Sequence, residues 1–176
     1  MMKMIKAGRT SLVVVMSLFL ALFAAGCGYH IAGKAGQMPG GVKSLSIPVF
    51  ANNTGKPDIE SIMTTAFVEE FVTTVNVFDD ADALLAGVVK SYSLKAVSFT
   101  KDDINQEYRL TATLSLRLVR RDTQEVLWSD ENVVDYEDFI VNTEDVAATE
   151  EAEIEALRKL AVDTARVVKE RMLENF

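Results

Sequence analysis

Cysteine and histidine are almost absent from this 176-residue chain, since each occurs only once. Cys27 is the only thiol, so no disulfide can form within the chain. The single histidine, His30, lies in a glycine-rich stretch close to the N-terminus. A histidine-based nucleophile, general base or metal site inside a folded domain is therefore excluded.

Recognisable catalytic motifs are also missing. The chain has no glycine-rich phosphate loop and no Walker pattern. Carboxylates are plentiful, and the densest groups are Asp79, Asp80 and Asp82, and Asp102 with Asp103. We interpret these as solvated turn and strand-flank residues; the alternative, a carboxylate-dependent hydrolase, would need an essential acidic pair. The sequence predicts a protein that is not an enzyme and that binds no metal or cofactor.

Basic residues are too few for a general nucleic-acid binder. The chain has 18 Lys and Arg against 26 Asp and Glu, a formal net charge of −8. Cleavage before Cys27 would remove Lys3, Lys6 and Arg9 and bring the net charge to −11. Phosphates require a basic face, so we expect no nucleic-acid partner.

The only long apolar run lies at the N-terminus. Residues 11–25 carry no charge, follow a short positive head and end in small residues. A membrane-spanning helix needs about 20 apolar residues, so this shorter run is typical of a secretory signal peptide. The alternative is an uncleaved apolar segment with a buried free thiol.

Cys27 directly follows the small residues, as in a bacterial lipoprotein signal, although Ala24 stands where leucine is usual. We predict a cleaved lipoprotein signal peptide over residues 1–26 and a lipidated, glycine-rich tether over residues 27–41. Two or three acyl chains on Cys27 would anchor the protein stably to a membrane. Gly28 replaces the aspartate that usually signals inner-membrane retention, which favours the outer membrane.

Residues 42–176 are predicted to form one α/β domain. The clearest pattern runs from Tyr108 to Leu118, where apolar and polar residues alternate strictly. Strands are predicted at 42–50, 83–99, 107–121 and 126–136, and helices from 57 and from about 149. The first crossover implies parallel strands, and the later three strands an antiparallel meander. The prediction is a two-layer α/β sandwich, a four-stranded mixed sheet with two helices packed on one face, in the order β-α-β-β-β-α.

Three local features refine this prediction. Pro48 cannot donate to a strand ladder, so we expect a sheet edge or a strand end there. The apolar residues of 83–99 change parity along the strand, which a bulge or bend near Ala96 would explain. Residues 137–148 are polar and acidic, and we expect a loop.

Arg117, Arg120 and Arg121 form the one basic cluster next to a predicted tight turn. Two hypotheses account for them. They protect an edge strand and keep the protein soluble, or they form an anion site, because guanidinium groups match phosphate oxygens bidentately.

Several stretches resemble the LPS-assembly lipoprotein family LptE. They are "CGYHIAG", "MPGGVKSLSIPVFANNTGKPDIE", "TTAFVEEF" and "DALLAGVV", and the likeness covers essentially the whole mature chain. The resemblance implies an outer-membrane lipoprotein on the periplasmic side, which sits as a plug inside the LptD β-barrel. It also implies help with assembly of that barrel, delivery of lipopolysaccharide to the outer leaflet, and lipopolysaccharide binding through basic residues. Here the candidates for contact with lipopolysaccharide or the barrel are Arg117, Arg120 and Arg121.

A different function remains open from the sequence. A periplasmic lipoprotein that activates a cell-wall enzyme, or that serves another envelope machine as an accessory subunit, could be built on a similar two-layer domain. Co-purification with a large outer-membrane barrel distinguishes the two hypotheses.

Overall fold

The computed structural model describes residues 37–99, 105–142 and 144–174. The predicted signal peptide, Cys27, most of the tether and Asp102–Asp103 lie outside the described residues. The described elements, in chain order, are η1 (Pro39–Gly41), β1 (Ser44–Ser46), β2 (Ala51–Asn52), α2 (Ile59–Phe71), β3 (Asn76–Val77), β4 (Ala83–Phe99), β5 (Asn105–Arg120), β6 (Val126–Asn142) and α3 (Val146–Glu174). Neither described helix is both long enough and apolar enough to span a membrane.

The sheet has six strands rather than the predicted four. Its order is β3-β1-β4-β5-β6, and β2 pairs with β4 beside β1. The predicted strand 42–50 is two short strands, because the ladder stops at Ser46, ahead of Pro48, and resumes at Ala51. The second additional strand, β3, lies in the β-branched segment after α2 and pairs in parallel with β1.

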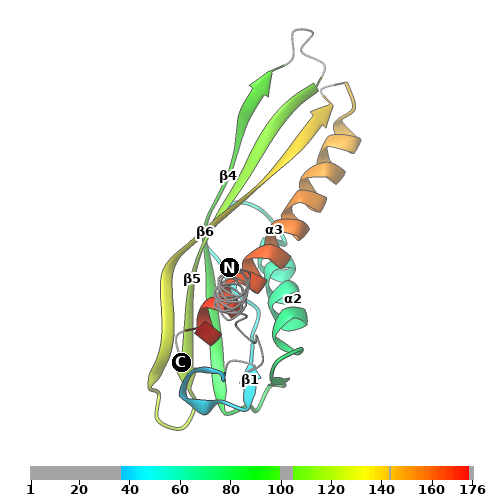
Figure 1. Ribbon diagram of the computed structural model, residues 1–176. Coiled ribbons are helices and arrows are strands. Elements are labelled where there is room, and N and C mark those ends of the chain that lie inside the picture. Colours follow the sequence, from blue (N-terminus) through cyan, green and yellow to red (C-terminus); the bar gives the residue numbers. More distant parts are fainter. Residues whose placement is uncertain (1–36, 100–104, 143, 175–176) are drawn as a thin grey trace, which may run out of the picture. The chain divides into compact units, whose positions relative to one another are not determined.

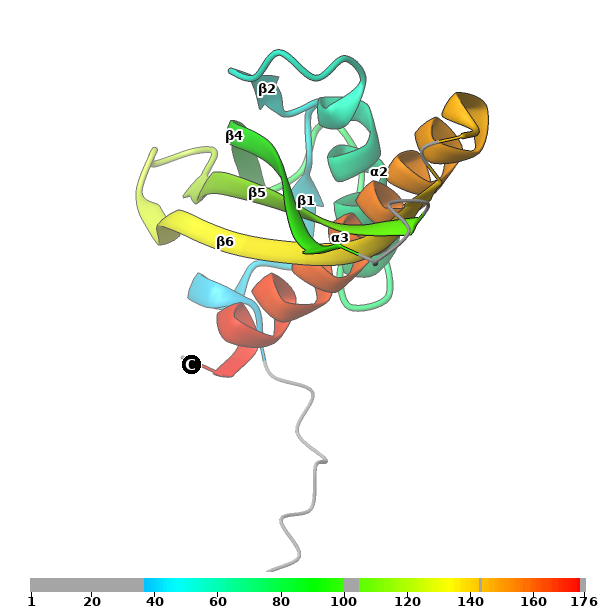
Figure 2. The ribbon, with the colours of Figure 1, turned by 90° about the horizontal axis from the view of Figure 1, so that it is seen from above.

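The strand directions agree with the prediction. β1 and β2 run parallel to β4, as the crossover through α2 requires. β4, β5 and β6 form the antiparallel meander and are the long strands, of 17, 16 and 17 residues. α2 and α3 cover one face of this sheet (Figures 1 and 2). No element that the structure describes covers the opposite face, the open face of the sheet.

β4 changes parity at two irregularities. The predicted bulge is present between Ala96 and Ser98, and a second lies between Val89 and Ser91. Between Ala83 and Val89, ahead of the bulge at Lys90, the odd-numbered residues Ala83, Leu85 and Val89 are buried. After that bulge the parity changes, and Tyr92 pairs with the buried Ala112. Leu84, Ala86 and Val88 consequently lie on the open face.

The core lies between the helices and the inner face of the sheet. Along β5, Leu110, Ala112, Leu114, Leu116 and Leu118 are all fully buried, which confirms the predicted alternation. Aromatic rings connect the sheet to α2 through a short chain of contacts. Phe50 meets Phe67 edge-to-face at 5.1 Å between ring centroids, and Phe67 stacks on Phe71 at 6.2 Å. These large apolar groups supply much of the burial that fixes α2 to the sheet.

β6 and α3 extend beyond their predicted limits. β6 continues to Asn142, so the predicted loop at 137–148 is wrong for its first half. The added segment is stable as a strand because its acidic groups find partners: Lys159 of α3 bonds to Glu137. Thr164 also donates to Asp135 across 2.9 Å, and Arg171 to Asp130 across 3.3 Å. This row of contacts holds α3 along β6.

Candidate functional site

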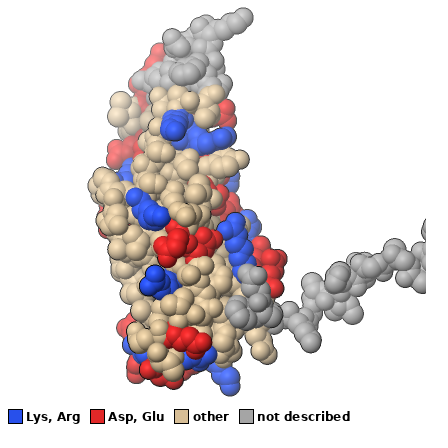
Figure 3. Space-filling view, turned by 90° about the vertical axis from the view of Figure 1, so that its left-hand side faces the viewer, with Lys and Arg blue, Asp and Glu red and all other residues tan. Residues whose placement is uncertain are grey.

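The open face of the sheet and the arginine-bearing end of β5 are the candidate functional surfaces. Figure 3 views the molecule from the side on which the sheet lies in Figure 1. The surface is mostly uncharged, and the acidic and basic side chains on it are interspersed rather than gathered into one patch.

Arg117 is the one predicted site arginine on this open face. Its guanidinium lies 3.5 Å from Glu131 of β6, and both side chains are more than half exposed. Glu131 also accepts a 2.6 Å hydrogen bond from Ser115. The Ser115 bond, with the charge of Arg117, lowers the pKa of Glu131 despite the opposing effect of desolvation. The side chains of Arg117 and Glu131 are both largely exposed, so Arg117 remains accessible to a partner.

Arg120 and Arg121 mainly hold the chain's own backbone. Arg120 donates to the carbonyl of Gly40 across 2.7 Å. Arg121 donates to the carbonyls of Asp79 and Ala81 across 2.5 and 2.9 Å. These bonds tie the turn after β5 to the lead-in segment and to the loop before β4.

The structure brings Arg120 and Arg121 together at one hollow of about 430 Å³, and leaves Arg117 outside it. Three cations face three carboxylates around this hollow: Lys43, Arg120 and Arg121 against Asp80, Asp82 and Asp122. The balance of charge is zero, so the hollow is not a strongly cationic phosphate cradle. Sequence reasoning missed Lys43, because nothing local shows that β1 begins beside the turn after β5.

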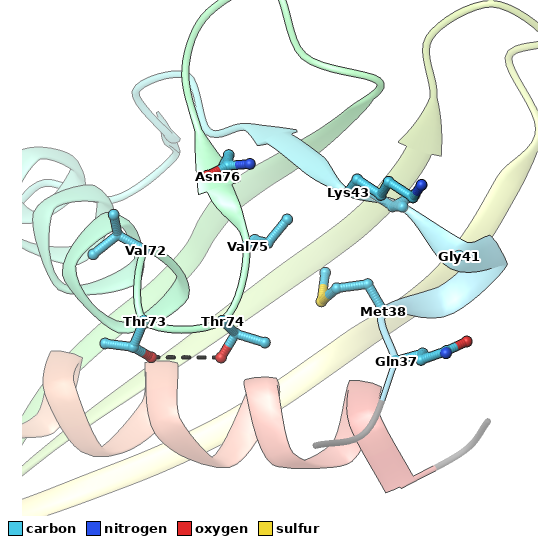
Figure 4. Close-up of a pocket in the computed structure, with 10 residues that line it drawn as sticks. Gln37, Met38, Gly41, Lys43, Val72, Thr73, Thr74, Val75 and Asn76 are labelled. Carbon is cyan, nitrogen blue, oxygen red and sulfur yellow. Dashed lines mark hydrogen bonds between the residues drawn. The ribbon is translucent and has the colours of Figure 1, made fainter. Parts of the chain in front are cut away.

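A second hollow, of about 500 Å³, lies where the described chain begins (Figure 4). Its walls are the lead-in segment 37–43 and the turn 72–76 between α2 and β3. Met38 reaches toward that turn, whereas Gln37 points away from it (Figure 4). The lining mixes amides, hydroxyls and aliphatic groups with one cation, Lys43, and holds no nucleophile paired with a base.

A second pair of opposite charges lies on the open face, where Arg109 of β5 is opposite Asp138 of β6. Arg109 makes two 2.7 Å hydrogen bonds to the carboxylate of Asp138, and its guanidinium lies 4.1 Å from the ring centroid of Tyr136. The bond from Arg109 lowers the pKa of Asp138. A bidentate pair stacked on an aromatic ring is held more rigidly than an ordinary surface ion pair.

A largely buried charged cluster connects the loop before α2 to α3. Lys56 lies 2.5 Å from Glu153, which also accepts a hydrogen bond from Tyr92. Burial opposes ionisation of Glu153, but the bonds from Lys56 and Tyr92 outweigh it and lower its pKa. Burial, then the bond to Glu153, raises the pKa of Tyr92. Both groups keep their ordinary charge states at neutral pH, so the cluster is a structural link between the elements.

No arrangement for catalysis emerges from the residues that the structure describes. Within them, no three His, Cys, Asp or Glu side chains converge in a way that could hold a metal ion. Of the densest carboxylates, Asp79 and Asp82 offer backbone carbonyls to Arg121, and the side chain of Asp80 lies 4.0 Å from it. These contacts agree with the interpretation of the acids as strand-flank residues.

Comparisons with known proteins identify one family. The model of the LptE family, described as lipopolysaccharide-assembly, matches residues 42–172. The comparison with curated sequences finds no match. Among solved structures, a minor lipoprotein from Acinetobacter baumannii is 14% identical, over 76% of this chain and 92% of its own, with a TM-score of 0.47. Rare lipoprotein B from Shewanella oneidensis is 14% identical, over 75% of this chain and 92% of its own, with a TM-score of 0.45.

Proposed function

The chain belongs to the LptE family of lipopolysaccharide-assembly proteins, and we propose that it is an outer-membrane lipoprotein that plugs the LptD β-barrel. In this role it helps to assemble the barrel for lipopolysaccharide transport and insertion into the outer leaflet. The observation that carries the proposal is the family match, which spans all the strands, α2 and nearly all of α3. LptE proteins are non-catalytic envelope lipoproteins, in agreement with the missing catalytic motifs.

The N-terminal sequence supports a lipid anchor. Acylation of Cys27 would place the attachment point ten residues before Gln37, where the described chain begins. Ten residues of extended chain reach at most about 33–36 Å. The anchor would therefore keep the domain near the inner surface of the outer membrane, where a periplasmic opening of the barrel is within reach.

The shape and polarity of the sheet suit the lumen of a large barrel. A strand of 17 residues runs about 55 Å, which exceeds the ~25 Å apolar band of an outer-membrane barrel. The lumen of such a barrel is polar and wet. The ion pairs Arg109–Asp138 and Arg117–Glu131 can remain hydrated there, so the sheet could enter the lumen without burying unpaired charges.

Arg117 is the best-placed of the three arginines for contact with lipopolysaccharide. Its guanidinium is exposed, whereas Arg120 and Arg121 already donate to carbonyls of the chain. If Arg117 binds lipid phosphates, Arg117→Ala weakens lipopolysaccharide binding by the isolated domain, and added salt weakens the wild-type interaction. If it serves only the barrel, lipid binding is unchanged and barrel co-purification falls.

Affinity purification from outer-membrane extracts tests the proposed function. The tagged full-length chain should recover an LptD-type barrel in near-equal amount, and Cys27→Ser should lose the lipid anchor. Mass spectrometry of the mature N-terminus shows whether Cys27 carries acyl chains. Recovery of a different envelope protein, with no barrel, would favour the accessory-subunit alternative instead.

A further inference from the structure

The open face of the sheet carries more apolar surface than a solvated sheet face requires. An antiparallel sheet with one face in water normally shows polar residues there. The central strand follows that rule, with Thr111, Thr113 and Ser115 between two arginines. The flanking strands β4 and β6 do not: their apolar residues on this face are Leu84, Ala86 and Val88 of β4 and Val126, Val134, Tyr136 and Ile140 of β6.

Several of these side chains are strongly exposed. Val134, Tyr136 and Ile140 are 58%, 55% and 67% exposed and follow each other along one face of β6. At the other end of the sheet, Leu84, Val119 and Val126 form one cross-strand row over three strands. Grouped apolar side chains of this kind, on a face that no described element covers, mark an interaction surface.

The open face is close to neutral, whereas the rest of the domain is acidic. It carries four basic residues, Lys90, Lys95, Arg109 and Arg117, and three acidic ones, Glu107, Glu131 and Asp138. The mature chain as a whole would have a net charge of −11, so the acidic surplus lies elsewhere. Figure 3 shows the two signs interspersed on a largely uncharged surface. Depletion of unpaired charge, with exposed Tyr and Arg, is typical of the centre of protein interfaces.

We propose that this open face, rather than the helical side, is the surface that docks against the inner wall of the barrel. The inference rests on the proposed function and adds the docking surface to it. A second copy of the chain fits less well, because face-to-face pairing would bury the polar row from Arg109 to Arg117 in a dry contact. The lumen of a large barrel is polar and holds water, so docking there can leave those groups hydrated. The wall needs to exclude water only over the apolar side chains of β4 and β6.

Two matched substitutions test the proposal. Val134 lies on the open face, whereas Val162 of α3 lies on the helical side, where it lines a hollow with residues of α2. The two valines are 58% and 47% exposed. Val134→Arg should lower the amount of barrel recovered with the tagged full-length chain by about tenfold or more. A tenfold loss of affinity corresponds to about 1.4 kcal/mol, which is the effect expected when one interface contact is lost. Val162→Arg should recover the barrel like the wild type. Thermal melts of both variants show whether either change acts through folding.

A photo-reactive side chain at Thr113, compared with one at Thr65 of α2, is the second measurement and needs no destabilising charge. Crosslinks to the barrel from Thr113 and not from Thr65 are expected. The proposal would be overturned if Val134→Arg and Val162→Arg lowered barrel recovery equally, or if crosslinks formed only from Thr65. In either case, barrel recovery by the wild type would still support the proposed function. A self-associating wild type made monomeric by Val134→Arg, with barrel recovery unchanged, would identify a second copy as the occupant. If the wild type recovers no barrel, the proposed function itself is wrong.

Discussion

Gly87→Ala is expected to disturb the contact that seats α2 on the sheet. Gly87 lies on the inner face of β4, opposite Leu116. A Cβ atom added there would lie 2.6 Å from the Cγ and Cδ1 ring carbons of Phe50. Carbon atoms in contact normally stay about 3.5–4.0 Å apart, so the ring or the strand must move.

The ring of Phe50 has little freedom to move away. Its side chain is only 2% exposed, and its backbone N–H donates to Thr64 Oγ1 of α2 across 3.0 Å. On one side it meets Phe67, which is itself fully buried. Overpacking of a tight core costs about 1–3 kcal/mol. We therefore expect Gly87→Ala to lower the free energy of unfolding by that amount and the melting temperature by roughly 2–12 °C.

Urea unfolding of the domain measures this cost, and Gly55→Ala provides the matched control. A Cβ on Gly55 meets nothing within 4 Å, so that change should be neutral or slightly stabilising. Phe50→Leu combined with Gly87→Ala should cost less than the two single changes added together, because the smaller side chain relieves the overlap. The error of such comparisons is about 0.5 kcal/mol. If the free energies of unfolding of Gly87→Ala and Gly55→Ala differ by less than that, the close packing of Phe50 on Gly87 is wrong.

Four further substitutions probe other parts of the structure. Leu114→Ala removes a fully buried side chain and should cost about 2–5 kcal/mol in urea unfolding; a loss below 1 kcal/mol would contradict its core position. The pKa of Glu153 is lowered in the folded state, so its contribution is complete above its ordinary value of 4.5 and is lost as the pH falls through the lowered one. Glu153→Gln should therefore flatten the loss of stability with pH in that acidic range, and an unchanged pH profile would refute the Lys56 link. Arg121→Ala breaks two bonds to backbone carbonyls and should cost about 1–2 kcal/mol, whereas Arg117→Ala should stay within about 0.5 kcal/mol; equal costs would contradict the different roles.

The long elements could be predicted from sequence because their periodic signal is complete. In β5, every second residue from Leu110 to Leu118 is buried, and nothing in the strand competes with that pattern. β1, β2 and β3 have only two or three residues each, so no period can be recognised. Their place depends on parallel pairing with distant residues, as in Leu45 with Val77 and Ala51 with Val88.

The end of β6 was mispredicted for an electrostatic reason. Read locally, Glu137 and Asp138 belong to an acidic, loop-like segment. In the fold, Lys159 and Arg109 neutralise them, and these partners lie 22 and 29 residues away in the chain. A strand that is stabilised by such distant charges carries no local signature.

In the candidate site, too, the local pattern could be predicted from the sequence, whereas the long-range contacts could not. The cluster of arginines was visible in the sequence, but their separate surroundings were not. Arg120 and Arg121 bond to carbonyls 80 and 40 residues away, of Gly40 and Ala81, whereas Arg117 lies on the open face. The apolar character of that face was hidden as well, because the alternation in β5 indicated a polar surface and the bulges of β4 and β6 change which residues reach it.

The conductance of the barrel is the most direct test of a plug. The LptD-type barrel would be reconstituted in planar lipid bilayers, alone and together with this lipoprotein. A large barrel without a plug encloses an aqueous channel, so the barrel alone should conduct ions strongly. Addition of the full-length protein during assembly should close most of that conductance, and Val134→Arg should leave the pore open. An equally conducting barrel with the wild-type protein bound would contradict the plug.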